Sequence, residues 1–193
     1  MLNTAVRASG LVLVVGAALV GIAIVLVSFE PVVNQPFSPG VSLLFLLSSI
    51  LLLMTLPAMY AKQADSAGWL GLVGHALLQT GVLLLVVLAS TPILYPSLNP
   101  APSENIVLFF LAVAFTFGLL LTGIATIRAD IFPRWAGILL LAATVGFFFD
   151  FFVAEFLPPL VGQIGSAILG ILLAIALAGI GLALWVGNPR TEK

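Results

Sequence analysis

Six long runs of apolar residues constrain this chain more than any other feature of its sequence. None of them contains a lysine or an arginine, and they cover about 8–28, 41–60, 68–90, 106–127, 135–156 and 163–186. A helix needs about 20 predominantly apolar residues to cross the hydrocarbon layer of a bilayer. Helices also satisfy their own backbone hydrogen bonds, which lipid cannot do for an irregular segment. The sequence therefore predicts an all-α integral membrane protein, a six-transmembrane-helix bundle that forms a single domain over residues 1–193.

The composition agrees with this prediction and excludes several classes of function. Hydrophobic residues make up 62% of the chain and charged residues only 7%, whereas ordinary soluble domains carry about 25% charged residues. There is no basic cluster that could meet nucleic-acid phosphates. The lack of cysteine in the sequence removes disulfides and thiolate metal sites. The first run is longer than the core of a secretory signal and no small-residue cleavage pattern follows it, so we expect it to stay in the mature protein.

The positive charges alternate between the connecting segments. They lie before the first run, between the second and third, between the fourth and fifth, and after the sixth, as Arg7, Lys62, Arg128, Arg134, Arg190 and Lys193. The other connections, around 29–40, 91–105 and 157–162, carry none. Lysine and arginine are enriched in the cytoplasmic loops of membrane proteins. We therefore expect a multi-pass protein of the inner (plasma) membrane with both termini in the cytoplasm.

Three segments at the starts of the odd-numbered runs are similar to one another. They read RASGLVLVVG from residue 7, AGWLGLVGHA from residue 67 and PRWAGILLLA from residue 133. Gly10, Gly71 and Gly137 align at intervals of about one helical hairpin each. Three parallel hairpin repeats would explain this similarity. Shared apolar composition would explain it equally well.

Asp150 lies within a phenylalanine-rich segment, VGFFFDFFVAEF, at residues 145–156. By helical spacing Gly146 and Ala154 share its face, toward a neighbouring helix. No lysine or arginine lies inside a run, so a neutral carboxyl that donates a hydrogen bond is expected. Ser166 and Gln163 of the sixth predicted helix lie at a similar depth. Asp150 is thus either a link between the last two helices or a site for a proton or cation. The flanking aromatic side chains are expected to meet lipid: Phe148, Phe149, Phe151 and Phe152.

His75 is the single histidine of the chain, and Gln79, four residues later, shares its helix face. Counting the helical rise places His75 roughly 9 Å from Trp69, level with Thr122 of the fourth predicted helix. We therefore expect a polar patch of His75, Gln79 and Thr122, at a depth roughly 13 Å away from that of Asp150. His75 is either a neutral imidazole that shares hydrogen bonds or an axial ligand of haem or a pigment. The sequence requires no cofactor.

Three stretches carry a resemblance to a known group of proteins. They are RASGLVLVVGAAL, PAMYAKQADSAGWLGLVGHALLQTG and GIATIRADIFPRWAGILLLA. With them the chain resembles small uncharacterised polytopic inner-membrane proteins of bacteria. The resemblance implies a bundle of several membrane helices and transfers no activity.

The sequence contains few of the parts that an enzyme needs. We find no serine and histidine at matched depth, no paired acids for acid–base chemistry and no phosphate-binding glycine loop. The leading hypothesis is therefore a non-enzymatic membrane protein, either an accessory subunit or a binder of lipid or a small apolar ligand. Its expected partners are membrane lipid, other membrane subunits or a second copy. The alternatives are a small proton- or cation-coupled transporter using Asp150, and a haem- or pigment-binding subunit using His75.

Overall fold

The computed structural model describes residues 2–30, 38–95, 106–153 and 158–187. These residues form five helices and no strand: α1 (Leu2–Ser28), α2 (Pro39–Leu94), α3 (Ile106–Ala129), α4 (Arg134–Phe152) and α5 (Pro159–Val186). All five are long and apolar enough to cross a membrane. The all-α class is confirmed, and the fold is compatible with a multi-pass membrane protein.

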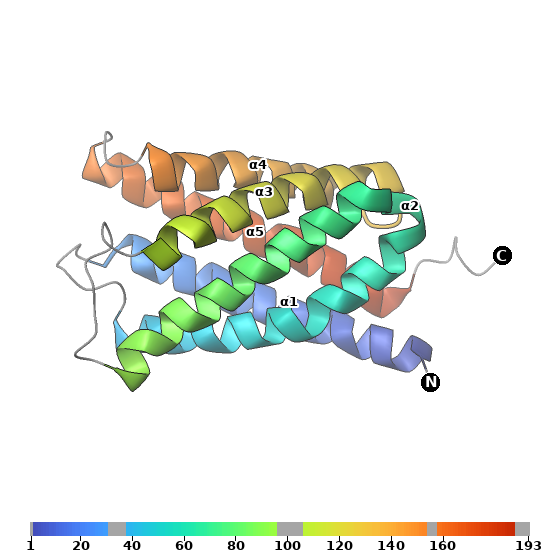
Figure 1. The fold of residues 1–193 in the computed structure, drawn as a ribbon, viewed down its shortest axis with the longest axis horizontal. Coiled ribbons are helices and arrows are strands. Elements are labelled where there is room, and N and C mark those ends of the chain that lie inside the picture. The colour runs from blue at the N-terminus through green and yellow to red at the C-terminus, as the bar shows by residue number, and fades with distance from the viewer. Residues whose placement is uncertain (1, 31–37, 96–105, 154–157, 188–193) are drawn as a thin grey trace.

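Helix α2 differs from the prediction, which placed separate helices at 41–60 and 68–90. The helix continues through Ala67 and leaves helical geometry only at Gly68, with φ 57° and ψ −153°. A straight helix of 56 residues would be roughly 84 Å long. Instead, two arms, 39–67 and 69–94, run in opposite directions (Figure 1). The prediction of a loop at 61–67 was wrong. Alanine, lysine and glutamine are good helix formers, so this segment is helical although it is polar.

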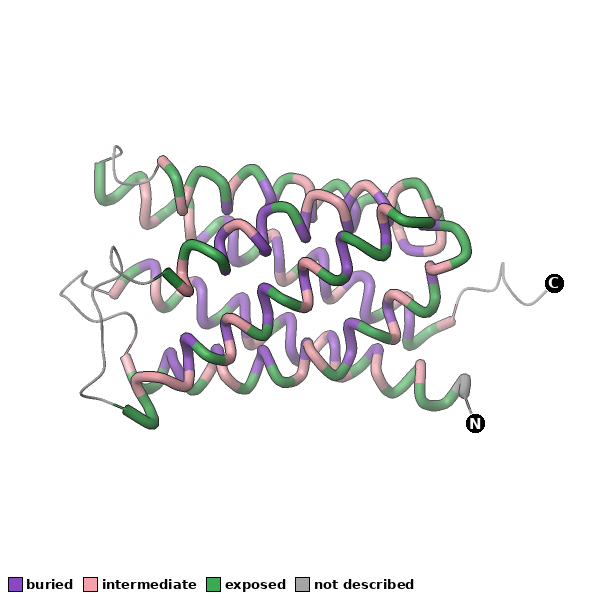
Figure 2. The backbone as a smooth tube through the Cα atoms, viewed as in Figure 1, coloured by how far each residue is buried: buried purple, intermediate pink, exposed green. Residues whose placement is uncertain are grey.

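If the two arms of α2 are counted separately, the helical segments form a closed ring. Helix α1 contacts both α5 and α2, α2 contacts α3, and α4 contacts both α3 and α5. Within α2, the 39–67 arm lies against α1, where Gly16 faces Leu51 and Leu52, and the 69–94 arm lies against α3, where Gly74 faces Thr122. Figure 2 shows the buried residues on the inner side of each helix. The largest fully buried aliphatic side chains include Leu13, Leu56, Leu119, Leu140, Leu173 and Ile180.

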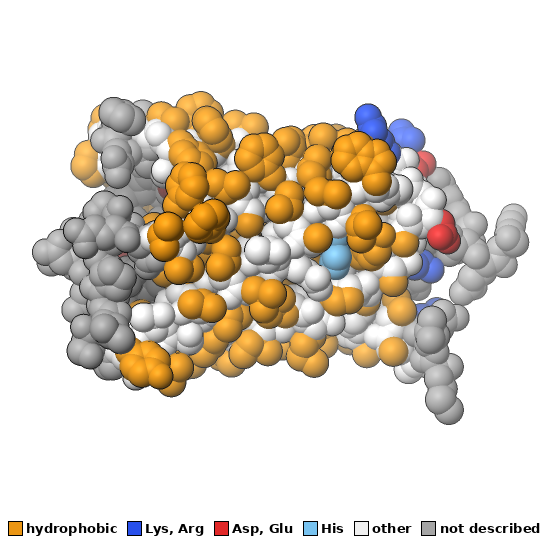
Figure 3. Space-filling view, viewed as in Figure 1, with side chains coloured by type: hydrophobic (Ala, Val, Ile, Leu, Met, Phe, Trp, Pro, Cys, Tyr) orange, Lys and Arg blue, Asp and Glu red, His pale blue; other side chains and the backbone are white. Residues whose placement is uncertain are grey.

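The two ends of the ring differ in charge. The N-terminus, the break at Gly68, the α3–α4 connection and the end of α5 all lie at one end (Figure 1). Figure 3 shows lysine and arginine side chains gathered there, with hydrophobic side chains along the rest of that face. We call this the cationic end, and its described cations, all exposed, are Arg7, Lys62, Arg128 and Arg134. The other two cations of the sequence, Arg190 and Lys193, lie outside the described residues.

Candidate functional site

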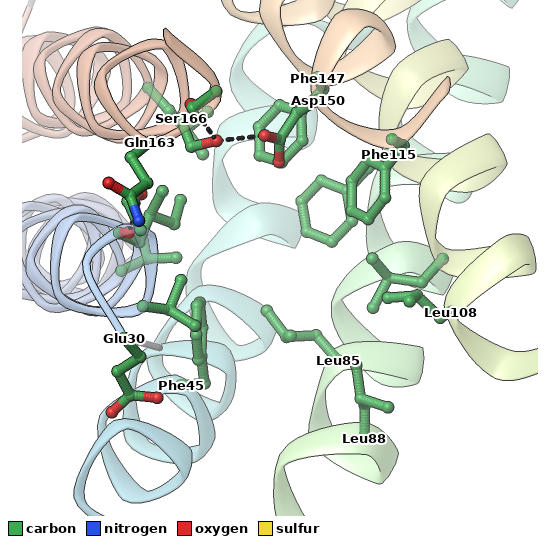
Figure 4. Close-up of a pocket in the computed structure, with 18 of the residues that line it drawn as sticks. Glu30, Phe45, Leu85, Leu88, Leu108, Phe115, Phe147, Asp150, Gln163 and Ser166 are labelled. Carbon is green, nitrogen blue, oxygen red and sulfur yellow. Dashed lines mark hydrogen bonds between the residues drawn. The ribbon is translucent and has the colours of Figure 1, made fainter. Parts of the chain in front are cut away.

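A cavity of about 380 Å³ lies inside the ring near the end opposite the cations. All five helices contribute to its walls, which are mainly aliphatic and aromatic (Figure 4). We call it the end cavity. The lining includes Val20, Ile24, Val27 and Ser28 of α1, Phe45, Leu85 and Leu88 of α2, Leu108, Leu111 and Phe115 of α3, Phe147, Asp150 and Phe151 of α4, and Pro159, Gly162, Gln163, Ser166 and Leu173 of α5, together with Glu30.

Large aliphatic side chains close the end cavity on the side of the cationic end. Deeper in the ring, a second space of only about 10 Å³ remains between residues that include Leu56, Leu78 and Leu119. Three residues line both spaces and so form the floor between them: Val20, Phe115 and Leu173. The end cavity is therefore a chamber at one end of the bundle, and between the described residues it narrows along the ring axis to the space of about 10 Å³.

Asp150 of α4 and Ser166 of α5 meet on one wall of this chamber. The Ser166 hydroxyl hydrogen bonds to Asp150 Oδ1 (Figure 4), and Ser166 Oγ also lies 3.1 Å from the carbonyl oxygen of Gly162. A hydroxyl has one hydrogen to donate. Ser166 can therefore donate to an ionised Asp150, or it can donate to Gly162 while a protonated Asp150 donates to Ser166. The predicted link between the last two helices is present, and it suits either protonation state.

Gln163, also predicted from the sequence, lines the same chamber one residue after Gly162. Gly146 packs against Leu169 of α5, as the expected face of Asp150 requires. Ala154, the other residue predicted on that face, lies outside the described residues. The polar residues expected around Asp150 thus belong to one wall of a cavity that the sequence did not predict.

Glu30 was not identified from the sequence as a site residue. It follows α1 directly, and its Oε2 accepts a hydrogen bond of 3.1 Å from the backbone N–H of Ser38, the residue that caps α2. The carboxylate therefore connects the end of α1 to the start of α2 beside the cavity. Only its position as the single acid between two predicted spans could have drawn attention to it.

Three phenylalanines stack along the cavity wall. The ring centroids of Phe115 and Phe147 are 5.7 Å apart, and those of Phe147 and Phe151 are 5.9 Å apart, with interplanar angles of 20° and 14°. The prediction that Phe151 faces lipid was wrong, because it lies four residues after the buried Phe147 and lines the cavity with it. The other three predicted lipid-facing rings are exposed: Phe148, Phe149 and Phe152.

The predicted patch around His75 lies elsewhere in the ring. His75 is buried, and its ring stacks on Tyr60 with the centroids 5.1 Å apart. Thr122 is buried beside the neighbouring Gly74, while Gln79 is half-buried. Among the described residues no hydrogen bond joins these three side chains, and His75 Nδ1 and Thr122 Oγ1 have no protein partner. None of the three lines the end cavity. The structure therefore separates this patch from Asp150.

Two further buried polar residues lie near the cationic end, and neither was identified from the sequence as a site residue. Gln63 and Thr126 are fully buried, and their side-chain polar atoms have no hydrogen-bond partner in the part of the chain that the structure describes. Gln63 follows Leu56 by seven residues and Met59 by four, so it shares their buried face. Extending the helical period through 61–67 would have found it.

The fold and the cavity together define a class of protein: a helical bundle with an apolar outer surface that encloses a mainly apolar chamber with one polar wall. Among the described residues, no group of three or more histidine, aspartate or glutamate side chains could hold a metal ion. No protein-family model matches the chain, and neither a curated protein nor a solved structure matches it. The resemblance to bacterial inner-membrane proteins therefore stays a prediction.

Proposed function

We propose that this chain is a non-enzymatic integral membrane protein that binds a small amphipathic molecule in the end cavity. The observation that carries the proposal is the cavity itself, about 380 Å³ with Asp150, Gln163 and Ser166 on one wall. Ligand pockets in proteins measure roughly 300–1,000 Å³ and combine apolar walls with a few polar groups. Association with other membrane subunits or a second copy is a further expectation for the same protein.

The polar wall is essential to this proposal. An apolar molecule gains little on leaving lipid for an apolar cavity, because lipid tails are as apolar as leucine side chains. Hydrogen bonds inside the membrane, by contrast, have no water to compete with them. A ligand must therefore be held against lipid by the side chains around Asp150, while its apolar body fills the chamber.

The bundle would span the inner membrane of a bacterium six times, with each arm of α2 counted as one span. The cationic end would face the cytoplasm and the end cavity the outside. Support comes from the four described cations at one end of the bundle, because positive residues favour the cytoplasmic side. The parallel starts of α1, of the 69–94 arm and of α4 at that end (Figure 1) are compatible with three hairpin repeats.

Single cysteines test this orientation, since the natural chain has none. Tyr95 at the end of α2 and Lys62 near the cationic end are both exposed. A membrane-impermeant maleimide should label Tyr95→Cys in intact cells and Lys62→Cys only after lysis. Labelling of both from the same side would contradict the arrangement.

Two glycines of α5 provide a matched test of ligand binding. A Cβ atom added at Gly162 or Gly165 would meet no heavy atom within 4 Å, but only Gly162 lines the cavity. Naphthalenemethanol, a fluorescent alcohol with an apolar body, is a suitable probe in nanodiscs. We expect Gly162→Phe to weaken binding by at least about tenfold, because the ring fills the chamber, whereas Gly165→Phe should bind like the unmodified protein. Equal binding by both variants would contradict the proposal.

A small proton- or cation-coupled transporter is a second candidate, favoured by the position of Asp150 on the cavity wall. Ionisable groups within membrane segments commonly mark ion pathways. In proteoliposomes, Asp150→Asn should then abolish cation-driven flux while the protein stays folded. Unchanged flux in this variant would remove the candidate.

A further inference from the structure

We infer that the ligand of the end cavity carries a cationic amine head group, which pairs with Asp150 while the apolar body packs against the stacked phenylalanines. This inference rests on the proposed ligand-binding function and names the chemical class of the ligand. It follows from the charges that line the cavity, the hydrogen bonds of Asp150 and the aromatic wall.

The charges that line the cavity are all acidic. Asp150 and Glu30 both belong to the lining, and no described lining residue is a lysine or an arginine. The described cations lie at the cationic end, where one of them, Arg134, already pairs with Asp130 at 2.9 Å. An unpaired charge in a low-dielectric interior costs several kcal/mol. A carboxylate or phosphate head group would be such a charge, whereas an ammonium group would find a partner.

Ser166 allows Asp150 to accept such a partner without repacking. Without a ligand, a protonated Asp150 can donate to Ser166, which then donates to the Gly162 carbonyl oxygen 3.1 Å away. With an ammonium group present, rotation of the same hydroxyl lets it donate to the ionised carboxylate. Charge-assisted hydrogen bonds of this kind are about twice as strong as neutral ones. Both states use the positions in which the two side chains already lie.

The stacked rings of Phe115, Phe147 and Phe151 add a second feature that favours a cation. They share the cavity with Asp150, and Phe147 and Phe151 lie three residues before it and one residue after it on α4. The faces of aromatic rings are negative and attract ammonium groups within about 6 Å. A carboxylate beside aromatic rings therefore discriminates an amine from an alcohol of the same shape.

Three probes with one apolar body and different heads test this selectivity: naphthylmethylamine, naphthalenemethanol and naphthoate. Binding is measured by fluorescence titration in nanodiscs of zwitterionic lipid, with empty nanodiscs as the reference for partitioning. We expect the amine to bind at least about tenfold more tightly than the alcohol, as a charge-assisted hydrogen bond requires. Naphthoate should show no saturable binding.

Asp150→Asn keeps the shape of the side chain and removes its charge. The ratio of the alcohol Kd to the amine Kd should fall by about tenfold in this variant. Asp65→Asn is the matched control, because Asp65 is an exposed acid near the cationic end and does not line the cavity. If Asp150→Asn does not fold, the probe series on the unmodified protein still tests the preference for an amine, because it needs no variant.

The possible results separate the two proposals. Equal binding of amine and alcohol would overturn the amine head group and leave the ligand-binding cavity standing. An amine preference that survives Asp150→Asn would also overturn the pairing with Asp150. If none of the three probes binds, both the head group and the proposed function fail.

Discussion

The two ends of the bundle use the same kinds of residue for opposite purposes. At the cationic end, glycines bring backbones together: a methyl group at Gly10 would lie 2.5 Å from the carbonyl oxygen of Gly181, and one at Gly74 would lie 2.7 Å from the nitrogen of Thr122. At the other end, Gly162 and Gly165 have no such neighbours. Small residues close the ring where helices touch. Gly162 faces the end cavity and leaves it open, whereas Gly165 lies on the exposed side of α5.

The polar residues of the two ends differ in the same way. Asp150 and Ser166 are half-buried, hydrogen bonded and in contact with a cavity. Gln63 and Thr126 are fully buried near the cationic end, and their side-chain polar atoms have no partner among the described residues. A buried polar atom without a partner costs stability. The comparison therefore predicts that the buried polar residues near the cationic end destabilise the fold, whereas those at the end cavity serve ligand binding.

The largest effect is expected where the backbones are closest. Gly10→Val should lower the free energy of unfolding by about 3 kcal/mol, because its side chain would overlap the backbone of α5. Gly165 lies at an exposed position of α5, where an added Cβ meets no heavy atom within 4 Å. Gly165→Val should therefore change the free energy of unfolding by less than about 0.5 kcal/mol. Denaturant unfolding in detergent micelles measures both. Similar losses in the two variants would remove the contrast between the ends.

The turn at the cationic end gives the next largest effect. Gly68 has a positive φ of 57° with ψ −153°, a combination that costs a residue with a Cβ energy. Gly68→Ala should therefore destabilise the protein by about 2 kcal/mol. Gly40→Ala is the control, since Gly40 has no positive φ and no heavy atom within 4 Å of an added Cβ. A Gly68→Ala protein as stable as the control would show that the turn tolerates another geometry.

Removing the buried amide near the cationic end should stabilise the protein. Gln63→Met replaces the side chain by one of similar length without its unpaired polar atoms, and we expect a gain of about 1 kcal/mol. Gln79→Met, at a half-buried position, should give a smaller change. Thermal unfolding followed by circular dichroism is sufficient. A loss of stability in Gln63→Met would mean that the amide has a partner in the membrane.

The smallest effect concerns the hydrogen bond at the end cavity. A double-mutant cycle of Asp150→Ala and Ser166→Ala should give a coupling free energy of about 0.6 kcal/mol, the average for side-chain hydrogen bonds between membrane helices. Unfolding of the two single variants and the double variant measures it. A coupling free energy of zero would contradict a stabilising hydrogen bond between the two helices. Ligand binding would then be the remaining role for both residues.

Much of the site near Asp150 could be predicted by counting residues along helices. Ser166 and Gln163 were placed beside Asp150 in this way, because depth in a membrane follows from the helical rise. Phe151 was assigned to the lipid and Glu30 was not identified as a site residue, since their surroundings depend on how helices rotate and on which helices are neighbours. Gln63 was missed because a polar stretch was taken for a loop.

The sequence by itself determined that the chain is helical and apolar and that its cations alternate between connections, because each of these depends on local composition and on the solvent. The tertiary structure alone decided that the helices form a ring, closed at one end and hollow at the other. That difference arises from contacts between residues far apart in the chain, such as Gly10 with Gly181 and Asp150 with Ser166. No periodicity within one helix records which neighbour it will meet, so the cavity exists only once all the helices have packed.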